Sequence, residues 1–354
     1  MLSDLKVIEL ASVLAGPDVG MFFAEMGAKV IKVENKSTKG DVTRSWKLAT
    51  ESKEASVSAY FSAINYNKEY VFYDLKDQTD KQEVLDLIKD ADIVIANFKP
   101  GADIQLGMDY KSLKKLNPTL IYGEINGYGK SSKRAAYDVV LQAETGYMSM
   151  NGTPTSGPVK MPIALIDVLA AHQLKEGLLL ALLNKAKTNK GSFVEVSLYD
   201  TAVSSLKNQA TNWLMNNFIP QRIGSLHPNI APYGETFETK DNRFLVLAIG
   251  NNKHFNQLLE IIGANELIDD EQFSTNQLRI KNRTLLDKGL QPYFKKSLSD
   301  DLMRSFLEKN IPVGIINNVK EVFENENAQQ LVLKENIDGI ATARVKTAVF
   351  KISD

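Results

Sequence analysis

Short apolar runs rich in β-branched residues alternate with stretches of helical spacing over the first two hundred residues of the chain. The runs that predict strands lie at residues 6–10, 29–34, 70–75, 92–98, 119–124 and 193–196. Helical spacing occurs between or after these runs, at residues 17–26, 81–91, 110–116, 168–187 and 199–216. This alternation predicts an α/β fold, in which helices cover both faces of a parallel sheet. Ligands of such sheets bind at the carboxyl ends of the strands.

The pattern changes after residue 216. Residues 218–234 contain three prolines and two glycines, which is the composition of a linker. Two strand patterns and several helical patterns follow as far as residue 309, and they predict a small α+β domain. A strand at 313–317 and a short helix at 319–323 are expected to return to the first domain. The predicted organisation is a Rossmann-like large domain of residues 1–215 with 311–354, a linker at 216–224 and a small domain at 225–310.

Composition limits which partners the chain can bind and which catalytic groups it can use. The net charge of −1 argues against nucleic acid or an anionic membrane as the main partner. The absence of cysteine excludes disulfides, thiolate catalysis and cysteine metal sites, and it fits a reducing compartment. Asp4 and Glu9 stand where a signal peptide would have its apolar core, and charged residues interrupt the apolar stretch 168–183. We therefore expect a cytoplasmic protein without a membrane span.

Asp167 is the most conspicuous candidate for chemistry, because it is the lone carboxylate in the apolar segment MPIALIDVLAA at residues 161–171. A buried charge costs free energy unless it has a partner, so it normally has a reason. One interpretation is a helix N-cap, since Asp167 directly precedes the helical pattern that begins at Val168. The other interpretation is a nucleophilic carboxylate. The segment alone leaves both interpretations open.

Two turns that follow predicted strands carry candidates for ligand binding. The segment ASVLAGP at residues 11–17 could receive an anion on its amides, although the G-x-G-x-x-G pattern of dinucleotide sites is absent. The segment NFKPG at residues 97–101 is either a ligand contact or a simple turn. Basic residues in and after the second predicted strand either hold phosphates or face water; they are Lys32, Lys36, Lys39 and Arg44.

Other residues have simpler explanations. The three histidines, His172, His227 and His254, show no spacing typical of metal ligands, so no metal site is expected. Tyr137 and Asp138 begin a helical stretch, where an aromatic core contact and a helix cap would explain them.

The order of several segments resembles that of the class III CoA-transferases, the CaiB/BaiF family that includes formyl-CoA and carnitine-CoA transferases. The resemblance runs nearly from end to end, and no single segment decides it. The segments are LKVIELASVLAGP, EMGAKVIKVEN, GDVTRSW, YDLKD, DIVIANFKPGADIQLGMDY, LIYGEINGYG, YDVVLQAETGYMSMNG, MPIALIDVLAA, KGSFVEVSLYDTAV, HPNIAPYGETFET and IPVGIINNVKEV.

The resemblance implies an enzyme that moves CoA from an acyl-CoA thioester to a free carboxylic acid. Asp167 falls on the family's catalytic aspartate, which forms mixed anhydrides and an aspartyl-CoA thioester. No tightly bound cofactor is implied, because the CoA thioester is the substrate. Members are interlaced homodimers, so a homodimer is expected here. The family's CoA-contacting positions fall on Leu14, Ala15, Tyr73, Asp74, Leu75, Lys76, Asn97, Phe98, Lys99, Tyr137 and Asp138.

Departures from the family pattern shape the expected substrates. Asn35 and Gln105 stand where the family has arginines for the nucleotide phosphates, so Lys36, Lys39 or Arg44 is expected to substitute. Leu14 replaces a glutamine of the formyl-CoA transferases, which argues against formate transfer to oxalate. Racemases of 2-methylacyl-CoA share the fold but carry a histidine where Tyr137 stands, and tyrosine, with a pKa of about 10, is a poor base. A transferase is the prediction, with a racemase or an inactive CoA-binding protein as alternatives.

Overall fold

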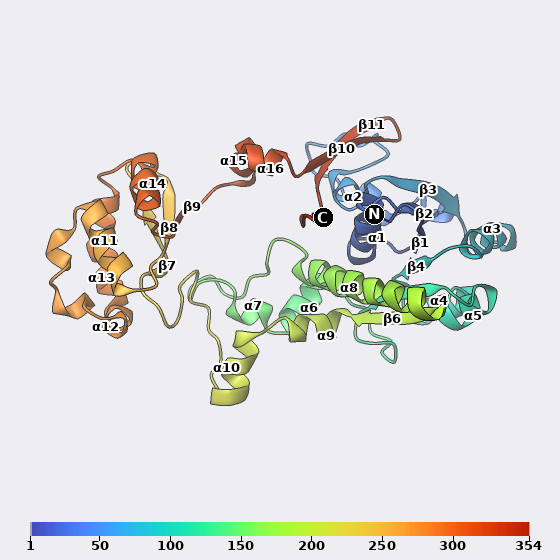
Figure 1. The fold of residues 1–354 in the computed structure, drawn as a ribbon, viewed down its shortest axis with the longest axis horizontal. Helices are drawn as coiled ribbons and strands as arrows, with labels where there is room; N and C mark the ends of the chain where they lie inside the picture. Colours follow the sequence, from blue (N-terminus) through green and yellow to red (C-terminus); the bar gives the residue numbers. More distant parts are fainter. Residues whose placement is uncertain (1, 354) are drawn as a thin grey trace. The chain divides into compact units, whose positions relative to one another are not determined.

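The computed structural model describes residues 2–353, and their contacts divide the chain into two compact units (Figure 1). The large unit comprises the residues up to Gly152, Ser156–Arg222 and the residues from Gln330 onward. The small unit comprises Thr153–Thr155 and Ile223–Gln329. The hydrophobic cores of each unit consist of that unit's own residues.

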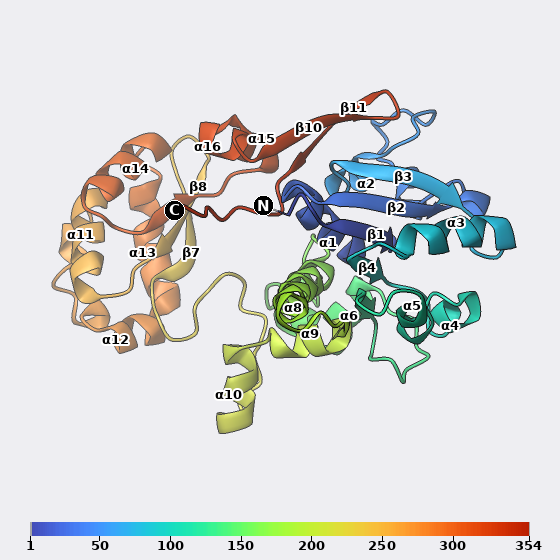
Figure 2. The same cartoon turned by 45° about the vertical axis from the view of Figure 1, so that its right-hand side comes forward.

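A six-stranded parallel sheet forms the centre of the large unit, as the alternating pattern predicts (Figure 2). The strand order is β3-β2-β1-β4-β5-β6, which is the order of doubly wound dinucleotide-binding folds. In the register, Ile8 of β1 lies beside Ile31 of β2 and Val94 of β4. The strands are β1 (Lys6–Leu10), β2 (Lys29–Asn35), β3 (Lys68–Tyr73), β4 (Ile93–Ala96), β5 (Ile121–Asn126) and β6 (Ser192–Ser197).

Each face of this sheet has its own core, because successive side chains of a strand point to opposite faces. Val7 belongs to the core that includes residues of α1 and α8, whereas Ile8 belongs to the core that includes residues of α3 and α5. These four helices are α1 (Ala15–Glu25), α3 (Gln78–Ile88), α5 (Tyr110–Leu116) and α8 (Leu165–Thr188). The sheet is therefore covered on both sides, and its strand ends are left to carry a site.

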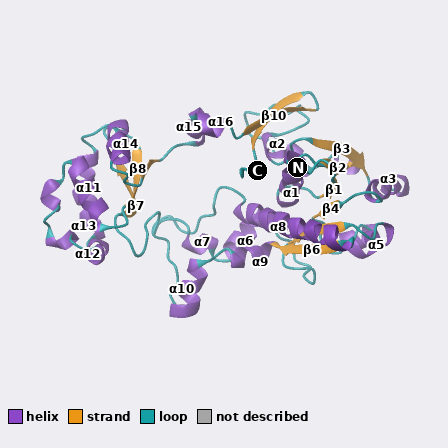
Figure 3. Cartoon of the chain, viewed as in Figure 1, coloured by secondary structure: helices purple, strands orange, loops and turns teal. Residues whose placement is uncertain are grey.

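The other helices of the large unit are short, as Figure 3 shows in purple. The prediction of a single helix at 199–216 is wrong, because the chain forms two helices there. Lys207, which lies between them, has a positive φ of 46°. The short helices are η1 (Lys36–Thr38), η2 (Val42–Ser45), α2 (Ala59–Ala63), α4 (Ala102–Leu106), α6 (Asp138–Glu144), α7 (Tyr147–Met150), α9 (Leu198–Ser204) and α10 (Asn208–Asn216).

A hairpin near the end of the chain was not predicted from the sequence. Its strands, β10 (Val332–Ile337) and β11 (Ile340–Val345), pair antiparallel through a turn at Asp338 and Gly339. Ile337 packs with Val57 and Phe61 of the large unit. The hairpin therefore belongs to the large unit although it follows the small unit in the sequence.

The small unit joins a three-stranded antiparallel sheet, in the order β7-β8-β9, to a layer of helices. The strand predicted at 313–317 was expected in the large domain, but β9 pairs with β8 and the return occurs only at Gln330. The strands are β7 (Tyr233–Glu238), β8 (Phe244–Ala248) and β9 (Val313–Ile315). The helices are α11 (Asn252–Ile262), η3 (Asn265–Leu267), η4 (Glu271–Phe273), α12 (Asn276–Lys281), α13 (Arg283–Phe294), α14 (Ser299–Glu308), α15 (Val319–Glu324) and α16 (Glu326–Gln329).

Within residues 2–353, no helix is both long enough and apolar enough to cross a membrane.

Candidate active site

Four neighbouring strands of the large unit end at one edge of the sheet, and the segments expected to contact CoA follow them. Residues 14 and 15 follow β1, Lys36 follows β2, residues 73–76 include the last residue of β3, and residues 97–99 follow β4. Because the strands are parallel, their carboxyl ends meet at the same edge. The fold therefore gathers four segments that lie far apart in the sequence.

Hydrogen bonds join the loops after β1 and β4, the neighbouring strands at which the strand order reverses. The Ser12 backbone N–H donates to Asn97 Oδ1 at 2.9 Å, and Asn97 Nδ2 donates to the Ser12 carbonyl at 2.8 Å. Leu14 is the N-cap of α1 and provides no side-chain hydrogen bond to the helix. A crevice at this point of an open α/β sheet is where such folds bind ligands. Asn97 fixes the spacing of the two loops at that point.

Asp167 is the third residue of α8 and lies in its first turn. The N-cap of this helix is Ala164, so Asp167 does not cap the helix and the capping interpretation is wrong. The side chain is half-buried, and its carboxylate makes no hydrogen bond or ion pair with any residue that the structure describes. A carboxylate in this state is free to react with a ligand.

Asp138 holds the start of α8 from outside that helix. Its Oδ2 accepts the Ile166 backbone N–H at 2.7 Å, and its Oδ1 accepts a hydrogen bond from Gln142 Nε2 at 2.6 Å. Gln142 Oε1 accepts the Met161 backbone N–H at 2.8 Å. Asp138 therefore caps α8 rather than its own helix α6, and it fixes the residue next to Asp167.

The surroundings of Asp167 oppose its ionisation. Burial, and then the negative charge of Asp138, raise the pKa of Asp167 from 3.8 to about 7. The partial positive charge at the start of α8 acts in the opposite direction. A carboxyl group with a pKa of about 7 is present at neutral pH in both its ionised and its protonated form.

Tyr60 of α2 is a neighbour that the sequence did not point to. Burial, and then the charges of Asp167, Asp138 and Asp41, raise the pKa of the Tyr60 hydroxyl to about 12, so it stays protonated at neutral pH. The Trp46 ring meets the Tyr60 ring edge-on at 5.1 Å between centroids. No spacing pattern in the sequence connects these aromatic residues to Asp167, because they lie more than a hundred positions away.

The cations proposed for phosphate binding differ in availability. Arg44 is buried and pairs with Glu34 at 2.5 Å and with Asp338 at 3.1 Å, so it is committed to the fold. Lys36 is exposed and lies 3.5 Å from Asp80. Lys39 lines an open cavity of about 820 Å³ in the large unit. Of the expected substitutes for the family's arginines, the two lysines are exposed to solvent and Arg44 is not.

The other predicted contacts differ in burial, since Tyr73, Leu75 and Phe98 are half-buried against the core on one face of the sheet. Lys76 and Lys99 are exposed, and Tyr137, the N-cap residue of α6, is 63% exposed and not a core residue. No group of three or more histidine, cysteine or carboxylate side chains is placed to hold a metal ion in the described part of the chain.

A comparison with known protein families matches residues 2–354 to CoA-transferase family III. The chain belongs to this family. The resemblance read from the sequence is thereby confirmed, and the protein is an acyl-CoA:carboxylate CoA-transferase of family III.

Relatives of this family III CoA-transferase are similar over most of their length. The succinate–glutarate CoA-transferase of Agrobacterium fabrum is 35% identical over 357 residues, which cover 98% of this chain and 88% of that protein. The acetyl-CoA:oxalate CoA-transferase of Acetobacter aceti is 33% identical over 321 residues, covering 90% of this chain and 81% of that protein. A CAIB/BAIF family protein from Brucella suis has a similar crystal structure, with a TM-score of 0.87 and 36% identity, covering 99% of this chain and 92% of that one.

Proposed function

We propose that Asp167 is the nucleophile that carries the transferred groups. Its carboxylate attacks the donor thioester, expelling CoA thiolate and leaving a mixed anhydride. The thiolate then attacks the aspartyl carbonyl, which releases the donor acid and leaves an aspartyl-CoA thioester. The acceptor carboxylate attacks this thioester to give a second mixed anhydride and CoA thiolate. Attack of the thiolate on the acceptor carbonyl gives the new acyl-CoA and restores the Asp167 carboxylate.

The observation that carries this proposal is the state of Asp167. It lies half-buried in the first turn of α8 with no hydrogen-bond partner among the described residues, so no structural bond must break before it reacts. Asp167 lies in an apolar segment between the buried Ile166 and the half-buried Val168, and surroundings poor in water protect an anhydride from hydrolysis. Asp138 supports the same geometry by holding the Ile166 amide.

CoA is proposed to bind along the carboxyl edge of the sheet. Residues 14–15, 73–76 and 97–99 follow strands that end at this edge, and Tyr137 and Asp138 start α6. Lys36 and Lys39 are placed after β2, where they could neutralise phosphates. This arrangement supports a nucleotide over the strand ends with its thioester directed to α8.

Short dicarboxylic acids are the proposed donor and acceptor class. Succinate and glutarate occur in the names of the Agrobacterium fabrum relative and of the human succinyl-CoA:glutarate CoA-transferase, which is 34% identical over 325 residues. The residue before Asp138 is Tyr137 and not a histidine, so the proposal does not extend to racemisation.

A homodimer is also proposed. Large apolar side chains are exposed on α10 and directly after it, and contiguous exposed apolar residues mark an interaction surface. These residues, called the α10 patch below, are Trp213, Leu214, Met215, Phe218 and Ile219.

Trapping the covalent intermediate tests the mechanism. The wild-type protein is incubated with succinyl-CoA, quenched with hydroxylamine and digested, and peptides are analysed by mass spectrometry. A hydroxamate at Asp167 is expected, because hydroxylamine cleaves anhydrides and thioesters of the aspartyl group. The matched control is Asp167→Asn, which has nearly the same shape. Transfer of CoA to glutarate without any adduct, or an active Asp167→Asn variant, would remove Asp167 from this role.

A further inference from the structure

The first turn of the large unit contains a strained residue. Val13 has φ = 72°, which lies in the left-handed region that β-branched side chains avoid. Such a conformation persists only where surrounding groups hold it, and strain of this kind gathers at functional sites. The residues that follow Val13 are Leu14 and Ala15, the segment proposed above to contact CoA.

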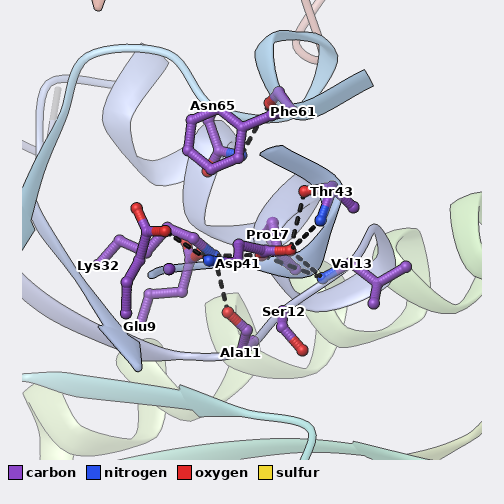
Figure 4. Close-up of polar contacts among 12 residues, drawn as sticks. Glu9, Ala11, Ser12, Val13, Pro17, Lys32, Asp41, Thr43, Phe61 and Asn65 are labelled. Carbon is purple, nitrogen blue, oxygen red and sulfur yellow. Dashed lines mark hydrogen bonds and ion pairs between the residues drawn. The ribbon is translucent and has the colours of Figure 1, made fainter. Parts of the chain in front are cut away.

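A buried carboxylate holds Val13 in place. The Val13 backbone N–H donates to Asp41, at 3.2 Å from Oδ2 and 3.4 Å from Oδ1 (Figure 4). Asp41 is itself fixed, because its Oδ1 accepts from the Thr43 N–H at 3.0 Å and from the Thr43 hydroxyl at 2.8 Å. Its own backbone N–H donates to Glu34 Oε2 at 2.6 Å. The carboxylate therefore has a set position under the turn.

Two buried lysines, Lys32 and Lys68, bind the backbone on either side of Val13. Lys32 Nζ contacts Asp41 Oδ2 at 3.1 Å and donates to Glu9 Oε1 and to the Ala11 carbonyl, both at 2.8 Å. Lys68 Nζ contacts Glu9 Oε2 at 2.8 Å and donates to the Pro17 carbonyl at 2.9 Å. The network thus holds the backbone before, at and after the strained residue.

Asp41, the carboxylate of this network that contacts the turn, has its charge compensated by Lys32. Burial alone would raise the pKa of Asp41, but Lys32 and the hydrogen bonds from Thr43 outweigh burial and leave that pKa below its ordinary value. Asp41 therefore stays ionised at neutral pH, as a carboxylate that accepts the Val13 amide must. Every side chain of this ion network is almost fully buried, and buried ion pairs contribute little net stability compared with apolar packing.

We infer that Asp41 is a positioning residue for CoA transfer, which clamps Val13 so that Leu14 and Ala15 are held rigid against the CoA thioester. The inference rests on the proposal that the turn contacts CoA. Asp41 does not touch the reacting atoms, and it acts through the backbone it holds. A rigid turn loses less entropy when the ligand binds, so loosening it weakens acyl-CoA binding.

Steady-state kinetics with succinyl-CoA and glutarate test the inference. Asp41→Asn removes the charge that pairs with Lys32 and replaces one of two oxygens that face only donors with an NH2 group. The KM for succinyl-CoA is therefore expected to rise about tenfold, with a smaller change in kcat. The matched control is Asp18→Asn, which breaks the buried ion pair between Asp18 of α1 and Lys175 of α8, 2.7 Å apart, and changes a side chain that makes no hydrogen bond to residues 11–15. This control is expected to lose stability and to keep its KM for succinyl-CoA.

A second substitution separates positioning from general stability. Glycine adopts φ = 72° without strain, so Val13→Gly in the Asp41→Asn background is expected to recover part of the lost affinity. Equal KM values for Asp41→Asn and Asp18→Asn, or no recovery with Val13→Gly, would overturn the inference. If Asp41→Asn does not fold, Thr43→Val removes one bond to Asp41 and must raise the KM in the same direction, and an unchanged KM overturns the inference.

The inference and the proposed mechanism fail in different experiments. Absence of a hydroxamate at Asp167 in the wild-type protein removes the covalent mechanism, whereas the KM comparison is measured on overall CoA transfer. An unchanged KM in Asp41→Asn, alongside a trapped adduct in wild type, removes only the role of Asp41.

Discussion

At the scale of single residues, Asp167 has a free carboxylate in surroundings that resist its charge. Its reactivity and its effect on stability have the same physical origin, which is burial without a compensating hydrogen bond. A carboxyl group whose pKa is higher in the folded protein than in the unfolded chain weakens folding as the pH rises between the two values. Asp167 therefore reduces stability at neutral pH, as expected for a group retained for chemistry.

Replacement of Asp167 by Asn is expected to abolish transfer and to stabilise the fold. The carboxyl titrates near 3.8 in the unfolded chain and at about 7 in the folded protein. The stability lost across that interval has an upper limit of about 4 kcal/mol, reached above the folded pKa, and the amide avoids it. Calorimetry should give a higher Tm for Asp167→Asn than for wild type, with a larger difference at about pH 8 than at about pH 5. An equal Tm at the higher pH would contradict the raised pKa.

The pH dependence of catalysis should report the same group. The nucleophile must be ionised, so kcat/KM for the donor acyl-CoA is expected to fall about tenfold per pH unit below the pKa and to reach a plateau above it. The midpoint is expected at about 7. Rates measured between about pH 5 and pH 9, with enzyme integrity checked at each pH, provide the profile. A flat profile across neutral pH would show that ionisation of Asp167 does not limit the reaction.

At the scale of secondary structure, the two helices α6 and α8 are joined through one side chain. Ala164 cannot cap α8 with its side chain, and Asp138 of α6 accepts the Ile166 amide instead. The same carboxylate raises the pKa of Asp167 by repulsion. Asp138 thus influences both the position and the charge of the proposed nucleophile.

Two substitutions at Asp138 separate these effects. Asp138→Ala removes the cap and is expected to cost about 1–2 kcal/mol of stability, together with a loss of kcat as the start of α8 loosens. Asp138→Asn keeps an oxygen that can accept the Ile166 amide but removes the charge, so the midpoint of the pH profile should shift below that of wild type. Denaturant unfolding and the pH profile of kcat/KM measure the two outcomes. An unshifted midpoint in Asp138→Asn would show that its charge does not act on Asp167.

The elements that the sequence predicted well are those with a repeated pattern. Buried runs of β-branched residues predicted the parallel strands, since a strand covered on both faces is apolar throughout. The hairpin β10–β11 was missed although its signal is present. Asp338-Gly339 separates two alternating strands, and both residues have positive φ, as a type I′ turn requires. The break at Lys207 has no comparable signal, because lysine is a good helix former.

At the scale of the whole molecule, the sheet topology explains which parts of the site could be predicted. Segments after parallel strands must meet at one edge, so the neighbourhood of residues 14–15, 73–76 and 97–99 follows from recognising the strands. The contacts of Tyr60 and Asp41 could not be predicted in this way. They depend on tertiary packing of the segment between β2 and β3, where no periodic pattern exists.

The α10 patch leads to the last prediction, which concerns assembly. Leu214 and Met215 are 78% and 75% exposed, and burying such side chains against a second copy would recover about 25 cal/mol per Å² of apolar surface. Light scattering after size-exclusion chromatography should therefore give twice the mass of one chain. Leu214→Glu places a charge in the patch and is expected to weaken the dimer at least about tenfold, because an unpaired charge resists burial.

The control for this prediction is Ile104→Glu on α4, which changes an exposed apolar residue outside the patch, 64% exposed. It should leave the dimer intact. A monomeric wild-type protein at micromolar concentration, or equal dissociation of both variants, would assign the α10 patch another role. Because a charge introduced at an exposed position does not disturb the core of the large unit, loss of the dimer in Leu214→Glu alone would locate the interface on α10.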